Sequence, residues 1–148
     1  MNNNIKLKNC FVMLKPGIIK RGKVGKVLSL LEDKNLVLDK IFSYKIQSNF
    51  IDEFYKVHIN KHFFSDLKKY LLNEKVIIVF LRLKNTDVDF DLLEYLNKLK
   101  GDCYSPEVGT IRFMWSSNTM ENVIHVSDSL ESYKYELNII VKYLETEK

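Results

Sequence analysis

The segment around His125 has residue types that could carry a phosphoryl group. A short apolar run leads into His125, and Ser127, Asp128 and Ser129 follow it at the predicted start of a long helix. A helix N-terminus attracts anions such as phosphate, because its first amide groups have no partner inside the helix. A neutral imidazole offers one lone-pair nitrogen for nucleophilic attack. Taken alone, the segment also fits a core histidine that is bonded to backbone groups.

Arginine is rare in this chain and therefore informative. Only three of the 23 basic residues are arginine, namely Arg21, Arg82 and Arg112. A guanidinium group can bind two phosphate oxygens at once, which an ammonium group cannot do. In so lysine-rich a chain, each arginine is therefore a weak indication of a site that needs this planar group of donors; a surface arginine is the alternative for Arg112.

The elements that must position these residues alternate between strands and helices. Apolar or strand-forming runs at residues 10–14, 36–44 and 76–83 predict strands, and residues 110–115 and 123–126 could each be extended. The run at 76–83 predicts a central strand with both faces buried. Apolar residues at helical spacing predict helices within 24–31, 50–54, 64–71, 92–99 and 133–144.

Polar residues at the ends of these runs predict where the helices begin and stop. Asn35 is placed to end the first helix, and Ser48 to cap the helix around Phe50. Asp128, with Glu131 three residues later, is placed to cap the last helix. The resulting order predicts an α/β (α+β) sandwich of the ferredoxin-like, split βαβ type, with a roughly four-stranded antiparallel sheet covered by helices.

Length and composition indicate one domain over residues 1–148. The net charge of +4 suits an anionic ligand such as a nucleotide, whereas a nucleic-acid-binding protein would usually show a stronger basic stripe. No apolar stretch predicts a membrane span or a secretory signal. Cys10 and Cys103 are expected to be reduced thiols, so we expect a cytoplasmic protein. His58 and His62 are expected on a solvated surface.

The histidine segment resembles the active-site signature of the nucleoside diphosphate kinases. It reads Asn122-Val-Ile-His-Val-Ser-Asp-Ser, where the family has Asn-x-x-His-Gly-Ser-Asp-Ser. The resemblance extends from about residue 10 to residue 141. Further matches stand in family order: Lys15-Pro16, Arg21-Gly22, Tyr55 before Phe63-Phe64, Gly109-Thr-Ile-Arg112, and Glu136 after the histidine.

The resemblance implies a nucleoside diphosphate kinase that moves the γ-phosphate of a nucleoside triphosphate to a nucleoside diphosphate through a phosphohistidine. His125 would be the nucleophile, and Glu136 would hold its second nitrogen. Ser127 would fix the Glu136 carboxylate. Lys15 and Tyr55 would lie near the transferring phosphate, although packing within its own helix is an equal alternative for Tyr55.

The resemblance also implies how the nucleotide is bound. Phe63 would stack on the base with Thr119 on the other side, Asn122 would reach a sugar hydroxyl, and Arg112 would bind phosphate. Ordinary core packing is the alternative for Phe63. Mg²⁺ would be held mainly by the nucleotide phosphates, with no metal site made of protein ligands. A homo-oligomer, hexamer or dimer, would be the assembly.

Between residues 82 and 108 the chain departs from the family pattern. The family usually has a second, phosphate-contacting arginine on a helix here, but this chain has no arginine between residues 91 and 103, and Lys98 or Lys100 could take its place. Val126 occupies the position of the signature glycine. These departures leave an alternative, a catalytically weak or inactive relative that acts as a nucleotide- or protein-binding module. An RNA-binding sandwich is a third hypothesis.

Overall fold

In the computed structural model, residues 5–85, 89–118 and 121–145 are described, and the strands among them form one four-stranded sheet in the order β2-β3-β1-β4. The strands are β1 (Asn9–Leu14), β2 (Leu36–Lys45), β3 (Lys75–Leu83) and β4 (Ile124–His125). Each neighbouring pair is antiparallel. The antiparallel sheet with its helices confirms the predicted ferredoxin-like class.

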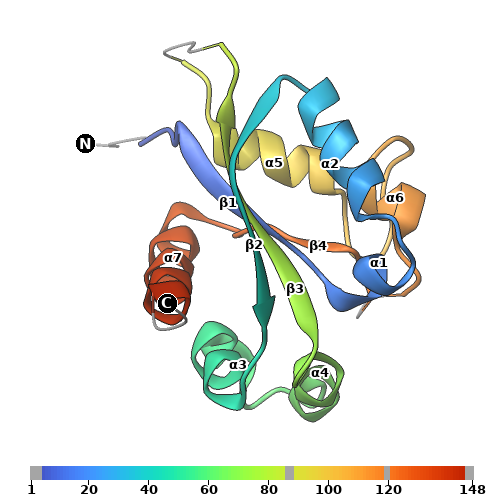
Figure 1. Ribbon diagram of the computed structural model, residues 1–148, viewed down its shortest axis with the longest axis vertical. Helices are drawn as coiled ribbons and strands as arrows, with labels where there is room; N and C mark the ends of the chain where they lie inside the picture. Colours follow the sequence, from blue (N-terminus) through green and yellow to red (C-terminus); the bar gives the residue numbers. More distant parts are fainter. Residues whose placement is uncertain (1–4, 86–88, 119–120, 146–148) are drawn as a thin grey trace.

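The helices lie on both sides of the strands. Figure 1 shows α1, α2, α5 and α6 to one side of the strands, and α3 with α7 to the other. Packing contacts join α2 to β2, α5 to β1 and α3 to α7. The helical segments are α1 (Pro16–Lys20), α2 (Val24–Asp33), α3 (Ser48–Phe54), the 3₁₀ turn η1 (Lys56–His58), α4 (Phe64–Leu71), α5 (Leu92–Lys100), α6 (Ile111–Trp115) and α7 (Leu130–Glu145).

The strand with both faces buried is β1, not β3. Five consecutive residues of β1, from Cys10 to Leu14, are buried, because helices cover both faces of this inner strand. Strand β3 does lie inside the sheet, between β2 and β1, as its apolar run predicted. Ile77 on one face of β3 and Phe80 on the other are nevertheless only half-buried, so neither face is completely covered.

Residues 111–115 form helix α6 with Thr110 as its N-cap, so the hypothesis that residues 110–115 could be extended was wrong. The Thr110 side chain caps α6 by accepting a hydrogen bond from the Phe113 amide at 3.3 Å. Ile111 supplies the buried contact of this helix, and α6 packs beside α5. A five-residue run is too short for its apolar spacing to distinguish helix from strand.

Helix ends agree only partly with the predicted signals. Asn35 has a φ of 65° directly after α2, as a helix-ending asparagine should. Helix α7 is capped by Ser129, whose hydroxyl accepts from the Ser132 amide at 3.1 Å, and not by Asp128. Helix α3 begins at Ser48 itself, which makes no capping hydrogen bond there. In both cases the chain enters the helix one or more residues away from the predicted cap.

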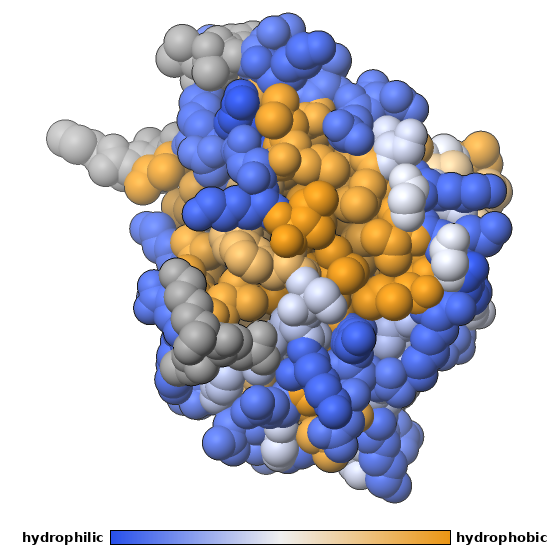
Figure 2. All heavy atoms as spheres, viewed as in Figure 1, coloured by the Kyte–Doolittle hydropathy of each residue, from blue (hydrophilic) through white to orange (hydrophobic). Residues whose placement is uncertain are grey.

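Part of the sheet face remains open to the outside. In the view of Figure 1, apolar surface gathers at the centre of the molecule and is framed by hydrophilic residues (Figure 2). Ile41 on the edge strand β2 is half exposed. Within the described ranges, no helix has both the length and the apolar character that crossing a bilayer requires.

Candidate active site

The imidazole of His125 is held on one side by a buried carboxylate. Its Nε2 is hydrogen-bonded to Oε1 of Glu136, and the Ser127 hydroxyl donates to the same oxygen at 3.0 Å. His125 lies in β4 and Glu136 in the second turn of α7, so the pair depends on how the helix returns over the sheet. An ionised carboxylate can only accept, so Nε2 carries the proton and Nδ1 remains as the nitrogen that can attack.

A strained turn fixes the start of β4. Val123 has a φ of 75°, and the Ile124 amide donates to the Asn122 carbonyl at 2.9 Å, which closes a three-residue turn. A β-branched residue in this backbone region costs about 1–3 kcal/mol. The Lys15 amide donates to the Val123 carbonyl at 2.8 Å, and this bond ties the turn to the end of β1. The turn therefore lies opposite Lys15, just past the end of β1 and two residues after Met13, the residue that pairs with His125.

Lys15 presents a buried ammonium group next to this turn. Its residue is only 7% exposed, and its Nζ donates to Oδ1 of Asn122 at 2.7 Å. Burial, above all, and then the positive charge of Arg112 lower the pKa of Lys15 from its ordinary 10.5 to about 7. Asn122 is itself buried, and its Nδ2 lies 3.7 Å from the Cys103 sulfur. An anion at this position would restore the positive charge of Lys15.

Arg112 is anchored by three backbone carbonyl groups. Its guanidinium donates to the carbonyls of Asn122, Gly101 and Ile124 at 3.3, 3.3 and 3.2 Å. Burial lowers the pKa of Arg112, which still remains charged. A guanidinium has five N–H groups, so these three bonds leave donors for a ligand. The arginine thus holds the α5–α6 connection against the turn before β4.

Aromatic rings form a wall beside His125. The rings of Phe54 and Tyr55 lie edge-on to the imidazole, with centroids 5.1 and 6.3 Å away. The Tyr55 hydroxyl is buried and has no hydrogen-bond partner among the described residues. Burial, with a smaller contribution from Glu136, raises the pKa of Tyr55, so its hydroxyl stays protonated. A buried donor of this kind ordinarily has a partner, and a ligand oxygen could supply one.

Phe63 lies at the outer end of this aromatic wall. Its ring is half-buried, 5.3 Å from the ring of His58 and 5.6 Å from that of His62. The Lys61 ammonium is 5.8 Å from the Phe63 centroid. The expected partner Thr119 lies outside the described residues. The Phe63 side chain is therefore partly accessible, as stacking on a base requires, and it also packs on the core.

Comparisons with known proteins agree on one family. The family model described as nucleoside diphosphate kinase matches residues 8–146. The chain belongs to the nucleoside diphosphate kinase family. It is 30% identical over 133 residues to the nucleoside diphosphate kinase of Picrophilus torridus, which covers 90% of this chain and 94% of the relative. With that of Thermoplasma volcanium it shares 32% over 130 residues, or 86% of this chain and 84% of the relative.

Solved structures give the same result. The halophilic nucleoside diphosphate kinase from Halobacterium salinarum, solved in complex with CDP, is 25% identical and aligns with a TM-score of 0.78. The alignment covers 88% of this chain and 85% of that one. The resemblance of the histidine segment to this family is thereby confirmed, and the activity of this protein is that of a nucleoside diphosphate kinase. None of the relatives reported favours a non-catalytic binding module.

The structure brings the expected kinase residues to one end of the sheet. His125, Glu136 and Ser127 form one hydrogen-bonded group. Lys15, Asn122 and Arg112 form the adjoining cationic group, and Tyr55 contacts the imidazole edge. Phe63 lies beyond Tyr55 and His58. The individual roles of these residues stay predictions.

Sequence reasoning missed several neighbours of this kinase site. Asn97 on α5 donates to the Ser127 carbonyl at 2.9 Å and so supports the residue that holds Glu136. His58 was expected on a solvated surface, but it is half-buried against Tyr55, and burial followed by Lys61 lowers its pKa. His62 is exposed as expected. The interval between Tyr55 and Phe63 could have indicated His58, since both flank it in the chain.

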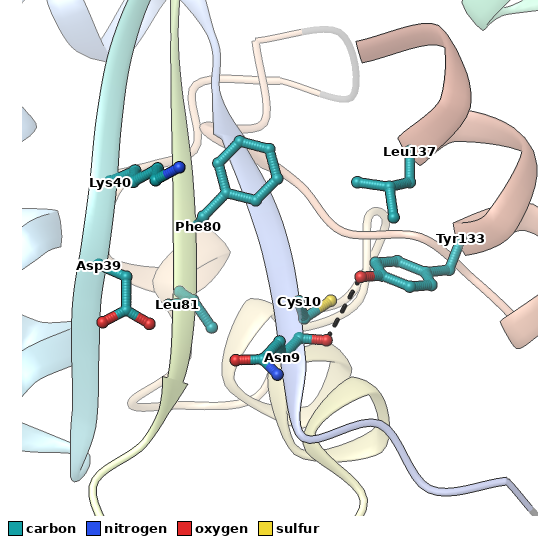
Figure 3. Close-up of a pocket in the computed structure, with 8 residues that line it drawn as sticks. All are labelled: Asn9, Cys10, Asp39, Lys40, Phe80, Leu81, Tyr133 and Leu137. Atoms are coloured by element: carbon teal, nitrogen blue, oxygen red, sulfur yellow. Dashed lines mark hydrogen bonds between the residues drawn. The ribbon is translucent and has the colours of Figure 1, made fainter. Parts of the chain in front are cut away.

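A shallow hollow of about 250 Å³ lies elsewhere on the open face of the sheet. Figure 3 shows Phe80, Leu137 and Tyr133 around it, with the Tyr133 hydroxyl donating to the Asn9 carbonyl at 3.4 Å. None of the expected catalytic or nucleotide-binding residues lines this hollow. A kinase site open to a polyphosphate need not be an enclosed cavity, so we assign the chemistry by residue type and geometry.

Proposed function

We propose that this kinase works by a ping-pong route with His125 as the nucleophile. The Nδ1 lone pair attacks the γ-phosphorus of a nucleoside triphosphate, and the bond from this phosphorus to the β,γ-bridging oxygen breaks. The nucleoside diphosphate leaves with that electron pair. In the second half-reaction, a terminal phosphate oxygen of another nucleoside diphosphate attacks the phosphohistidine and releases the imidazole. The observation that carries the proposal is the Nε2 bond to Glu136, which leaves Nδ1 to react.

Glu136 and Ser127 act on the imidazole and not on the nucleotide. When Nδ1 bonds to phosphorus, the ring becomes positively charged, and the adjacent Glu136 carboxylate stabilises that charge. The Ser127 hydroxyl, fully buried, keeps the carboxylate oxygen in place. Both residues therefore orient the nucleophile before substrate arrives.

Lys15, Arg112 and Tyr55 supply donors for the phosphate oxygens. Phosphoryl transfer depends mainly on positioning and on stabilising charge at oxygen atoms. Lys15 and Arg112 are cations next to the turn before β4, and Tyr55, whose hydroxyl is buried, contacts the edge of the imidazole. Their arrangement supports a γ-phosphate that lies between them and His125.

Phe63, Thr119 and Asn122 complete the nucleotide site in this proposal. Phe63 stacks on the base, and the Asn122 amide nitrogen reaches a sugar hydroxyl while its oxygen holds Lys15. Thr119, outside the described residues, is the residue that the family resemblance assigns to the other face of the base. Stacking accepts any base, because every base has a π-face. The CDP complex of the Halobacterium salinarum relative supports the same class of ligand here, nucleoside di- and triphosphates.

Mg²⁺ accompanies the nucleotide in this proposal. Lys15 and Arg112, next to the expected phosphate position, are cations, which would repel a bare divalent ion and fit one that is already bound to phosphate oxygens. When bound there, Mg²⁺ neutralises charge on the phosphates. The residues of this chain then need only bind the remaining oxygens.

We further propose one domain over residues 1–148 that works as a homo-oligomer, dimer or hexamer, in the cytoplasm. The ten-residue edge strand β2 and the apolar surface around Ile41 support self-association, because an unpaired edge readily joins a second copy. The two cysteines, Cys10 and Cys103, form no disulfide, which supports a reducing compartment.

The decisive experiment is transfer from γ-labelled ATP in two stages. The wild-type protein should become labelled in an acid-labile, base-stable form, and added CDP should then remove the label as labelled CTP. His125→Ala should fold and remain unlabelled, whereas His62→Ala, an exposed control on the same chain, should behave as wild type. Labelling of His125→Ala at the wild-type level would refute the assignment.

A further inference from the structure

Lys100 is a buried cation that the proposed mechanism does not use. It is the last residue of α5 and is only 8% exposed. Its Nζ lies 3.7 Å from Oδ1 of Asp128, whose side chain is 88% exposed. That distance is longer than a good hydrogen bond, and a solvated carboxylate compensates poorly for burying an ammonium group. Lys100 is therefore held loosely, in a place where a lysine is costly unless something pairs with it.

The surroundings of Lys100 belong to the phosphate site. Helix α5 ends beside α6 (Figure 1), and the carbonyl of Gly101, the next residue, accepts from Arg112 at 3.3 Å. Lys100 is near enough to Lys15 to lower its pKa, after the larger effects of burial and Arg112, which lower it, and of Cys103, which raises it. Three cations from three different parts of the chain thus lie close enough to repel one another, and the carboxylate that pairs with Lys100 is the exposed Asp128. An anion is the kind of ligand that would relieve their mutual repulsion.

The neighbouring lysine on the same helix does not share these features. The Lys98 side chain is 75% exposed and pairs with Glu94 one turn earlier, 3.3 Å away. Two residues along a helix correspond to about 200° of rotation, so Lys98 and Lys100 face opposite ways. Lys98 is therefore a solvated surface residue and provides a matched control.

We propose that Lys100 is a third phosphate-binding cation, which pairs with Asp128 when no nucleotide is bound. On binding, the Lys100 ammonium exchanges the Asp128 carboxylate for phosphate oxygens, and Asp128 turns into solvent. Asp128 thus competes with the phosphates for the same cation. This inference rests on the proposed function, since it assigns the same site a further residue for the polyphosphate of its substrate.

The test compares Lys100→Met with Lys98→Met, using calorimetry with ADP and with adenosine. Lys100→Met should weaken ADP binding about tenfold or more at low salt, the usual loss for a charge-assisted hydrogen bond. Adenosine binding should not change, because it carries no phosphate. The loss should shrink in 0.5 M salt, roughly as screening predicts. Lys98→Met should bind both ligands as wild type does.

Asp128→Asn provides an independent variant at an exposed position that should fold normally. It should bind ADP several-fold more tightly than wild type, and the gain should vanish when Lys100→Met is added. Wild-type ADP affinity in Lys100→Met, or a parallel loss of adenosine binding with a lower unfolding temperature, would overturn the assignment. Unchanged or weaker ADP binding in Asp128→Asn would show that Asp128 does not compete with the phosphates for Lys100. Labelling of the wild type with γ-labelled ATP, measured first, keeps these outcomes separate from failure of the phosphohistidine route.

Discussion

Nucleotide binding should weaken steeply as pH rises above neutrality, because Lys15 is a buried lysine that loses its proton. Its pKa in the free protein is about 7, against an ordinary 10.5, mainly through burial and secondly through Arg112. A bound phosphate gives the ammonium a counter-charge and raises its pKa again. Between these two pKa values, binding must therefore take up a proton. The affinity should fall about tenfold for each pH unit in that range.

ADP is fully ionised between pH 7.5 and 9.5, so its own titration adds nothing there. Over those two pH units the dissociation constant should rise about 100-fold, or roughly 2.7 kcal/mol. The pKa of Lys100 is also lowered, by burial first, and its titration has the same sign. Lys15→Met separates the two contributions. It should bind ADP weakly at all pH values, and its remaining dependence on pH should be much flatter than that of the wild type.

The titration of Lys15 should also affect the stability of the free protein. Its sign is opposite: raising the pH weakens nucleotide binding but stabilises the folded state. The unfolded chain has the ordinary lysine pKa, so between pH 7 and 10.5 it binds more protons at Lys15 than the folded chain does. The free energy of unfolding should therefore rise with pH in this window, relative to Lys15→Met. Each pKa unit corresponds to about 1.4 kcal/mol, so the full lowering of the Lys15 pKa changes the free energy of unfolding by at most about 5 kcal/mol.

Calorimetry in two buffers of different ionisation enthalpy would measure the proton uptake directly, and urea unfolding at pH 6 and 9 would measure stability. Uptake approaching one proton at pH 8.5, absent in Lys15→Met, is the expected result. If the wild-type dissociation constant for ADP changes less than about threefold from pH 7.5 to 9.5, Lys15 is charged in the free protein. The account of its burial would then be wrong.

Four further outcomes follow from the site and the fold. Glu136→Gln should lower turnover by about 10²–10⁴-fold while ADP affinity stays nearly constant, since the carboxylate acts on the imidazole; equal losses in steady-state turnover and in calorimetry would make Glu136 a structural residue. Phe63→Ala should weaken ADP and CDP alike, by about 1–3 kcal/mol, and a loss confined to one base would refute simple stacking. Gly101→Ala should destabilise the fold by about 2 kcal/mol or more, because Gly101 has a φ of 89° and an added Cβ would lie 2.4 Å from the Thr110 hydroxyl oxygen. Gly25→Ala, within α2 and with open space around it, should instead stabilise by about 0.5–1 kcal/mol in the same urea titration.

Much of the fold could be predicted because the strong patterns are long. The runs that became β1, β2 and β3 and the spacing that became α2, α4, α5 and α7 all lie close to their predicted places. Short segments failed where a local hydrogen bond decided the outcome. Thr110 converts a strand-like run into α6, and Ser129 replaces Asp128 as the cap of α7. Such bonds depend on backbone angles that residue types do not specify.

The sequence alone determined the chemistry of this protein. The spacing of the histidine signature and of Lys15, Arg112 and Glu136 indicates the family, and the comparisons confirm it. Only the tertiary structure decided which atoms meet. Strand pairing and the return of α7 over the sheet produce the strained turn at Val123, the hydrogen bond between Nε2 of His125 and Glu136, and the proximity of Lys15, Lys100 and Arg112. Lys98 and Lys100 read alike in the sequence, and the rotation of α5 alone buries one at the phosphate site and leaves the other in solvent.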